Sequence, residues 1–225
     1  MRRTISKSSK KKLAGRHTAG EDEQTCAADL QWQDHLRAAY ETIDGYALAR
    51  TEKKRQRDDG VFLDGIQYGE IDFVSFATAL AWCNPVAGER FIDLGSGTGK
   101  ATLTAAANHA FSSAAGVEIL PPLHEAAQQA FERCNKSVLL CPNITFHCAD
   151  ALTFPWTSAN VIFVSTTCWT EEMCAKLASD ASSLQSGARL LCTSRELESS
   201  DLRLLRRGAL PYGRGMLTFL AYERI

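Results

Sequence analysis

The sequence predicts an α/β fold with a mostly parallel sheet, and two features of the chain carry this prediction. Short apolar runs, such as residues 90–94 and 160–164, alternate with helical patterns of about 10–15 residues. A glycine-rich turn separates the first run from an alanine-rich helix. Strands separated by helices form βαβ units, whose right-handed crossovers make neighbouring strands parallel. Such a sheet binds its ligand beyond the carboxyl ends of its strands.

Local patterns predict the individual elements in order. Residues 29–57 space their apolar side chains as one amphipathic helix or two short ones would. A helix follows residues 67–71, and the prolines at 121–122 suit the first turn of another. Residues 215–222 alternate loosely, as an edge or hairpin strand would. The strands expected are residues 90–94, 114–119, 144–148, 160–164 and 188–193, and the helices between them are residues 100–110, 121–131 and 171–184.

The composition is that of an ordinary globular protein and excludes several classes. The 225 residues, 45% apolar and 23% charged, suffice for one α/β domain with an appendage. No run of about 18 apolar residues occurs, so we expect no membrane-spanning helix. No apolar stretch follows the basic N-terminus, so we expect no signal peptide. None of the eight cysteines belongs to a C-x-x-C pair, and Cys83, Cys134 and Cys192 lie in apolar runs. We therefore expect a reducing compartment and no structural zinc.

Positive charge is concentrated at the N-terminal end of the chain. Residues 1–57 hold 13 Lys/Arg against 8 Asp/Glu, with basic clusters at residues 2–3, 10–12 and 53–57. Such clusters either address a protein to the nucleus or bind phosphate backbones; a solvated tail without a partner is the alternative. We expect a disordered basic tail over residues 1–28, a helical extension over residues 29–60 and the main domain over residues 61–225.

The glycine loop of residues 93–100 reads D-x-G-x-G-x-G and lies between a strand and a helix. Its glycines let the main chain approach a ligand closely. Glu118 ends the next strand 19 residues after Gly99, where an acid can bind both hydroxyls of a ribose. A dinucleotide loop reads G-x-G-x-x-G and binds pyrophosphate, which Asp93 would repel. The pattern favours a cationic nucleoside without phosphate, S-adenosylmethionine, over a dinucleotide or a purely structural turn.

Two further strand ends supply candidate residues. Asp150 can accept a hydrogen bond from the adenine amine beside the Ala151 amide, or cap the turn that follows it. The loop of residues 165–169, Ser-Thr-Thr-Cys-Trp, should face the transferred methyl group, although Trp169 could instead be a core aromatic. The histidines at 109, 124 and 147 are not spaced as a metal site or triad, and we interpret them as structural or solvent-facing.

Methyl transfer is an in-line displacement that needs alignment and exclusion of water more than acid–base catalysis. A lysine acceptor must be neutral, and an apolar or aromatic channel disfavours its ammonium form. The candidates to line such a channel are Trp169, the hydroxyls of residues 165–167 and the segment Tyr68-Gly69-Glu70-Ile71.

Residues 67–71 (Q-Y-G-E-I), 91–100, 116–118, Asp150 and 161–164 together resemble the disruptor-of-telomeric-silencing family, in order and spacing, over roughly residues 66–195. The resemblance implies a Rossmann-like class I S-adenosylmethionine-dependent methyltransferase with a seven-stranded sheet. It also implies a nuclear enzyme that methylates a globular-core lysine of histone H3 in nucleosomes, binding DNA through the basic tail. The cofactor contacts that it implies are Tyr68, Gly69, Glu70, Ile71, Phe91, Asp93, Leu94, Gly95, Ser96, Gly97, Thr98, Gly99, Lys100, Glu118, Asp150 and Ala151. We assign Tyr68, Ser165 and Trp169 to catalysis.

The chain departs from the family after its fourth strand, where two asparagines and an aromatic are usual and Ser165, Thr166 and Thr167 stand instead. Three hypotheses follow. The first is a nucleosome-dependent histone-lysine methyltransferase. The second is a methyltransferase for another protein or a small molecule. The third is an inactive domain that binds chromatin and keeps the cofactor only as a structural ligand.

Overall fold

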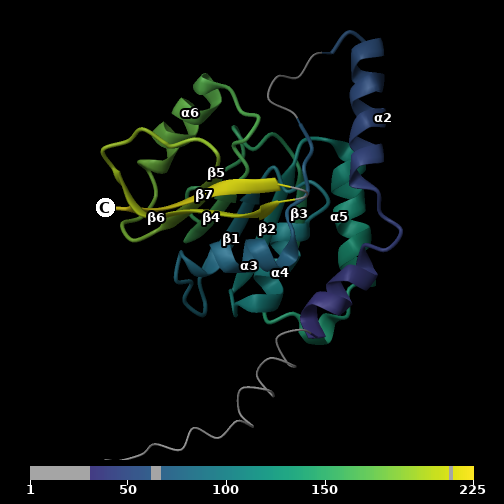
Figure 1. Ribbon diagram of the computed structural model, residues 1–225, viewed down its shortest axis with the longest axis horizontal. Coiled ribbons are helices and arrows are strands. Elements are labelled where there is room, and N and C mark those ends of the chain that lie inside the picture. The colour runs from purple at the N-terminus through teal and green to yellow at the C-terminus, as the bar shows by residue number, and fades with distance from the viewer. Residues whose placement is uncertain (1–30, 62–66, 213–214) are drawn as a thin grey trace, which may run out of the picture.

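The computed structural model describes residues 31–61, 67–212 and 215–225. The predicted basic tail of residues 1–28 lies outside the described residues. The core is a seven-stranded sheet of order β3-β2-β1-β4-β5-β7-β6 (Figure 1), which confirms the predicted mostly parallel seven-stranded sheet. Its strands are β1 Arg90–Leu94, β2 Ser113–Glu118, β3 Ile144–Cys148, β4 Val161–Val164, β5 Arg189–Thr193, β6 Leu202–Tyr212 and β7 Gly215–Arg224.

The parallel part of the sheet determines where a ligand can bind. Strand β1 pairs in parallel with β2 on one side and with β4 on the other, and β2–β3 and β4–β5 are also parallel pairs. The carboxyl ends of these five strands therefore meet at one edge. The glycine loop and residues 165–169, which follow β1 and β4, lie at that edge.

Alternate side chains of β1 point to opposite faces of the sheet, each covered by helices. Ile92 and Leu94 pack in one core with α6 (Glu171–Ala181). Phe91 packs in the other core with α3 (Phe73–Ala81) and α4 (Lys100–Asn108), and α5 (Pro121–Arg133) packs beside α4. A short 3₁₀ helix, η1 (Lys136–Val138), precedes β3.

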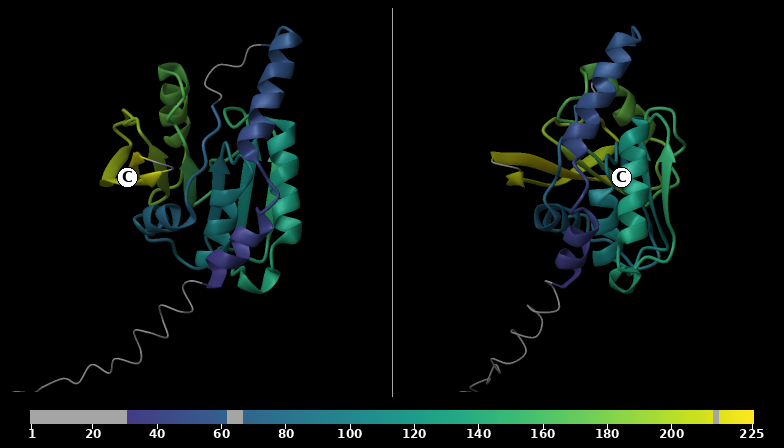
Figure 2. Two further views of the ribbon diagram at one scale, coloured as in Figure 1. Left: turned by 45° about the vertical axis from the view of Figure 1, so that its right-hand side comes forward. Right: turned by 90° about the vertical axis from the view of Figure 1, so that its right-hand side faces the viewer.

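The N-terminal extension forms two helices rather than one. Residues 31–39 are helical, and α2 (Gly45–Asp58) begins anew after Asp44, whose carboxylate accepts the Ala47 amide hydrogen at 2.9 Å. This N-cap is what separates them. Helix α2 lies beside α5, and its C-terminal half projects beyond the rest of the molecule (Figures 1 and 2).

The C-terminal strands are the part of the sheet that the sequence predicted least well. Strand β7 pairs antiparallel with both β5 and β6, so it is a hairpin strand, as expected, but not an edge strand. The edge is β6, for which no strand was predicted. Its residues 203–207 read R-L-L-R-R, which does not alternate apolar and polar side chains, and all five are exposed.

Within the described residues we find no membrane-spanning helix, no metal-binding cluster and no disulfide. No helix among them is long and apolar enough to span a bilayer. No cluster of three histidine, cysteine or acidic side chains within them is arranged to hold a metal ion. The cysteines in these ranges are free, and Cys83, Cys134 and Cys192 are buried.

Candidate functional site

A cavity of about 540 Å³ lies where β1, β2, β4 and β5 end, a size typical of a small-molecule site. Fifteen sequence-predicted site residues line it: Tyr68, Gly69, Glu70, Ile71, Asp93, Gly95, Ser96, Gly97, Thr98, Lys100, Glu118, Asp150, Ala151, Ser165 and Trp169. The structure thus brings together residues from five separate segments of the chain. The three histidines at 109, 124 and 147 are not among the lining residues.

Three predicted cofactor contacts do not line the cavity. Phe91 and Leu94 are buried in the two cores on either side of the sheet. Leu94 points to the face opposite Asp93, whereas Phe91 shares the face of Asp93 but lies two residues further from the carboxyl end of β1. Gly99 lies behind the loop, where a Cβ would come within 2.7 Å of the Phe146 ring. Its glycine is required for packing against β3 and α5.

The glycine loop is held open toward the cavity by backbone conformations that favour glycine. Gly95, Gly97 and Gly99 have φ values of +82°, +55° and +80°. A Cβ at Gly95 would meet nothing within 4 Å, so the main chain there borders open space. The Ser96 hydroxyl is buried without a hydrogen-bond partner in the described structure. A Cβ on Gly116 would come within 2.8 Å of this oxygen, so the Ser96 hydroxyl lies against β2.

Glu118 anchors the loop from the end of β2. Its carboxylate accepts hydrogen bonds from the Gly97 amide at 2.7 Å and from the Leu120 amide at 2.9 Å. Burial raises its pKa, and these amides oppose the shift. Each carboxylate oxygen keeps lone-pair capacity, so Glu118 can still accept hydrogen bonds from the two hydroxyls of a ribose.

Asp93 lies under the loop and is only 1% exposed. The Thr102 hydroxyl donates to its Oδ2 at 3.0 Å. Burial raises the pKa of Asp93 to about 7. A cationic group entering the cavity would favour the ionised form of this carboxyl.

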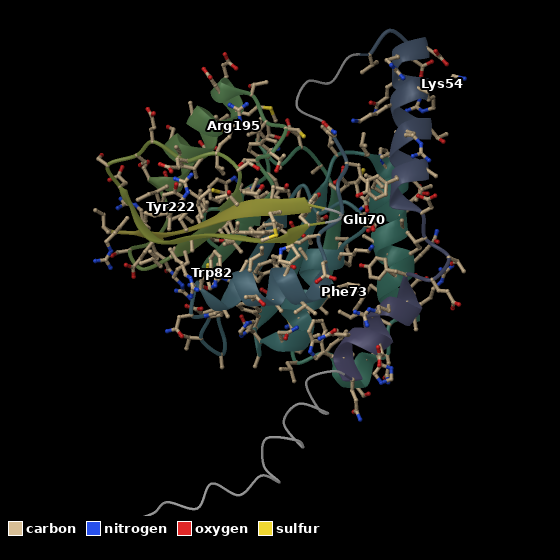
Figure 3. All side chains as sticks on the ribbon, viewed as in Figure 1. Lys54, Glu70, Phe73, Trp82, Arg195 and Tyr222 are labelled. Atoms are coloured by element: carbon tan, nitrogen blue, oxygen red, sulfur yellow. The ribbon has the colours of Figure 1, made fainter. Side chains whose placement is uncertain are left out.

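Residues 67–71 contact the glycine loop through hydrogen bonds and an ion pair. They lie beside the end of the β6–β7 hairpin (Figure 3). The Tyr68 hydroxyl donates to Glu70 Oε1 at 2.7 Å and lies 3.0 Å from the Thr98 hydroxyl. Glu70 forms an ion pair with Lys100, and its amide donates to the Tyr46 hydroxyl at 3.2 Å. Burial raises the pKa of Tyr68 well above its ordinary value, which keeps its hydroxyl a neutral donor.

Asp150 and Trp169 each fit both interpretations that the sequence left open. The Asp150 carboxylate accepts the Leu152 amide hydrogen at 2.9 Å, which stabilises the following turn, and the residue also lines the cavity. Trp169 is 9% exposed and packs in the core with α6, and it too lines the cavity.

The cavity also contains residues that the sequence reasoning missed, among them Tyr46, Met173, Thr193, Tyr212 and Leu217. Thr193 ends β5, and the rule that ligands bind at carboxyl ends of strands would have found it. Tyr46 and Tyr212 come from α2 and β6. No local pattern marks them, because only packing of the extension and the hairpin against the sheet brings them to this edge.

The residues present fit S-adenosylmethionine. The open main chain at Gly95 and the remaining hydrogen-bonding capacity of the Glu118 carboxylate suit a nucleoside with polar substituents. The buried carboxyl of Asp93 suits a cationic ligand and disfavours a phosphate.

Comparison with known proteins agrees with this geometry. Residues 61–208 match the family model described as histone methylation protein DOT1. The fold is similar to an RNA methyltransferase from Salinibacter ruber in complex with S-adenosyl-L-homocysteine, with TM-score 0.56 and 19% identity over 69% of this chain and 93% of that one. It is also similar to magnesium protoporphyrin IX methyltransferase from Synechocystis with bound S-adenosylmethionine, with TM-score 0.54 and 15% identity over 93% and 100% of the two chains. No curated protein sequence matches significantly.

The family match spans more than half of the chain, and the sheet order and the glycine loop agree with the methyltransferase fold. The chain belongs to the DOT1 family of histone methylation proteins.

Proposed function

We propose that this protein transfers a methyl group from S-adenosylmethionine to a lysine in the globular core of histone H3, in whole nucleosomes and in the nucleus. The observation that carries the proposal is the Tyr68–Glu70 segment bonded to the glycine loop at Thr98 and Lys100, inside the stretch that matches the DOT1 family model. Glycine loops are common to many methyltransferases, whereas the Tyr68–Glu70 segment is the most discriminating element of the chain.

Different residues of the cavity bind different parts of the cofactor. Glu118 accepts the ribose hydroxyls, Asp150 and the Ala151 amide bind the adenine, and Asp93 favours the cationic amino-acid end. The cofactor supplies a methyl group on a positively charged sulfur. The lysine nitrogen bonds to that carbon while the carbon–sulfur electron pair stays on sulfur, and the nitrogen then loses a proton to water. Tyr68, Ser165 and Trp169 align the acceptor and exclude water.

Nucleosomal DNA is negatively charged, and one face of α2 carries positive charge. Arg50, Lys53, Lys54 and Arg57 follow the spacing i, i+3, i+4, i+7, which places them along one face of the helix. None of the four forms an ion pair with any other residue that the structure describes. Figure 3 shows Lys54 on the projecting end of α2.

The opposite stripe of α2 carries the ion pairs that stabilise the projecting helix. Arg55 pairs with Glu52 and with Asp59. The four-residue cationic stripe is thereby left free for a partner. It starts one turn beyond Tyr46, which lines the cavity, and Arg57 lies about 16 Å along the helix from Tyr46. Phosphates of nucleosomal DNA beside the acceptor lysine suit this stripe, and the basic tail of residues 1–28 would add to the same interaction.

A second candidate function keeps the fold and changes the acceptor to another protein or a small molecule. The observation that favours it is the triplet Ser165-Thr166-Thr167, which stands where family members have two asparagines and an aromatic.

Tritiated S-adenosylmethionine with whole nucleosomes, followed by mass spectrometry of the histones, tests the proposal. We expect label on a globular-core lysine of histone H3. We expect none with the Gly97→Arg variant, because the glycine loop has no room for the arginine side chain and the cofactor would not bind. Deleting residues 1–25 should weaken nucleosome affinity. Label confined to free small acceptors, with activity indifferent to the deletion, would favour the second candidate. Cofactor binding without transfer to any histone would leave an inactive chromatin-binding domain.

A further inference from the structure

The hydroxyl of Tyr40 reaches the glycine loop from the N-terminal extension. Tyr40 directly follows the helix of residues 31–39 and is 7% exposed. Its hydroxyl donates to the Thr98 carbonyl at 2.9 Å in a buried hydrogen bond. Burial raises the pKa of Tyr40 well above its ordinary value, so the hydroxyl keeps the proton that it donates. The domain boundary that we expect at residue 61 places Tyr40 outside the methyltransferase domain.

Packing against the main domain fixes the position of Tyr40. Leu36 and Ala39 of the preceding helix are buried, and they belong to one core cluster with Leu103 of α4. The Tyr40 ring lies 5.9 Å from the Phe73 ring between their centres. Helix α4 begins directly after the glycine loop. The extension therefore packs on the same helix into which the loop leads.

The Thr98 carbonyl depends on Tyr40 for its hydrogen bond. A regular helix would supply the amide four residues further on, that of Thr102, but no backbone amide of the described residues donates to this carbonyl. The Thr102 hydroxyl donates instead to Asp93 at 3.0 Å, and the Thr102 amide also acts on that carboxyl, where both oppose the rise in pKa that burial causes. A buried carbonyl without a donor is costly. Tyr40 thus supplies the bond that the start of the helix does not.

The main chain by itself does not fix the direction of this carbonyl. Thr98 stands between Gly97 and Gly99, whose φ values are +55° and +80°. Glycine adopts positive and negative φ about equally well, so the peptide groups beside Thr98 can turn at little steric cost. Contacts from elsewhere in the fold must hold them in place. Tyr40 holds the Thr98 carbonyl, and the Tyr68 hydroxyl lies 3.0 Å from the hydroxyl of the same threonine.

The orientation of Thr98 affects the groups that face the cofactor. Thr98 lines the cavity beside Gly97. The Gly97 amide donates to the Glu118 carboxylate at 2.7 Å, and this carboxylate is the group that we expect to accept the ribose hydroxyls. A loop that turned at Thr98 would move the Gly97 amide and displace the carboxylate bonded to it. Cofactor affinity therefore depends on what holds Thr98.

We infer that Tyr40 is a positioning residue for the cofactor: by holding the Thr98 carbonyl, its hydroxyl keeps the glycine loop in the conformation that binds S-adenosylmethionine. The helical extension is then part of the cofactor-binding unit, because it supplies a contact that the loop needs. The inference concerns the cofactor alone, so it holds for any methyl acceptor and does not depend on the histone proposal.

Tyr40→Phe in the full chain tests the inference, because it removes the hydroxyl and keeps the ring. Tyr222→Phe is the matched control. Tyr222 is also buried, its hydroxyl accepts the Leu197 amide hydrogen at 3.1 Å, and it does not line the cavity. Isothermal titration calorimetry with S-adenosylmethionine should give a Kd about tenfold higher for Tyr40→Phe and an unchanged Kd for Tyr222→Phe. An unchanged Kd for Tyr40→Phe would overturn the inference, whatever its effect on thermal stability.

An unnatural side chain separates the hydrogen bond from the shape of the ring. The amino group of p-aminophenylalanine at position 40 can donate to the Thr98 carbonyl. It should therefore restore most of the cofactor affinity that Tyr40→Phe loses. A Kd equal to that of Tyr40→Phe would show that the hydrogen bond is not the cause, and the inference would fail.

The wild-type protein allows a test that does not require any variant to fold. A contact that strengthens cofactor binding must itself be strengthened by the cofactor. The Ile43 amide donates to the Tyr40 carbonyl at 3.0 Å, so its hydrogen exchange reports on the turn that carries Tyr40. S-adenosylmethionine should slow exchange at Ile43 about fivefold more than at Leu197, whose amide is bonded to Tyr222. Equal slowing at the two amides would overturn the inference.

Discussion

The ring of Tyr68 lies directly against Gly97, so that a Cβ on the glycine would come within 2.7 Å of the tyrosine Cε2. The tyrosine hydroxyl cannot easily move away, because it is bonded to Glu70 and lies 3.0 Å from the Thr98 hydroxyl. The segment before α3 and the glycine loop therefore form one unit, although they are about 30 residues apart in the chain.

Gly97→Ala should raise the cofactor Kd at least about tenfold, because the new methyl group displaces Tyr68 from the loop and the residue keeps a left-handed φ of +55°. Gly88→Ala is the matched control. Gly88 also has a positive φ, +87°, but a Cβ there meets nothing within 4 Å. Isothermal titration calorimetry with S-adenosylmethionine measures the Kd of each variant. Equal Kd values for the two variants would contradict the role given to Tyr68.

Lys100→Met should lower the free energy of unfolding by about 2 kcal/mol, because the Glu70 carboxylate loses its ion-pair partner at a site only about 20% exposed. Lys100 also lies 5.2 Å from the centre of the Tyr40 ring. Lys176→Met breaks an exposed pair with Asp180 and should cost less than about 0.5 kcal/mol. Urea denaturation measures both, and similar losses would show that the Lys100 pair is no more than a surface contact.

Asp93 should make the protein less stable as the pH rises from about 4 to about 7. Burial raises the pKa of the folded carboxyl to about 7, whereas in the unfolded chain it ionises near 3.9. Between these values the unfolded state releases a proton that the folded state keeps, so unfolding becomes more favourable with rising pH. The stability of Asp93→Asn relative to wild type should therefore increase from pH 5 to pH 8 in chemical denaturation. A difference that is independent of pH would refute the assignment.

The same carboxyl should make cofactor binding pH-dependent. The cationic cofactor favours ionised Asp93, so its Kd in the wild-type protein should fall as the pH rises from 6 to 8. In Asp93→Asn this part of the dependence should disappear, since no proton is released there on binding. Titration calorimetry in two buffers of different ionisation enthalpy would detect that proton directly.

Removing three charges from α2 should weaken DNA binding in a salt-dependent way. We expect Arg50→Gln/Lys54→Gln/Arg57→Gln to make the slope of log K against log salt for nucleosomes shallower by about 2.7, or 0.9 per lost phosphate contact. The control Lys176→Gln/Arg203→Gln/Arg207→Gln changes the net charge equally, but these cations are ion-paired with acidic residues elsewhere. Equal slopes for the two variants would mean that net charge acts and not the stripe.

Local sequence patterns were enough to predict the parallel sheet and the acids at the ends of β1 and β2. These features arise from local signals: an apolar run of strand length, a glycine turn with positive φ and a helix that begins directly after it. Asp93 and Glu118 therefore lie where the pattern placed them. The family resemblance rests on such short segments too, and the family match confirmed it.

Which side chains share the cavity depends on how distant segments pair and pack. Thr193 meets Ser165 across 28 residues because β5 pairs with β4, and Tyr212 reaches the site because a β6 strand without alternation folds back on β7. Phe91 and Leu94, within the best-predicted segment, turn into the cores instead. Pairing and packing depend on contacts between distant segments, and periodicity within one segment contains no information about them.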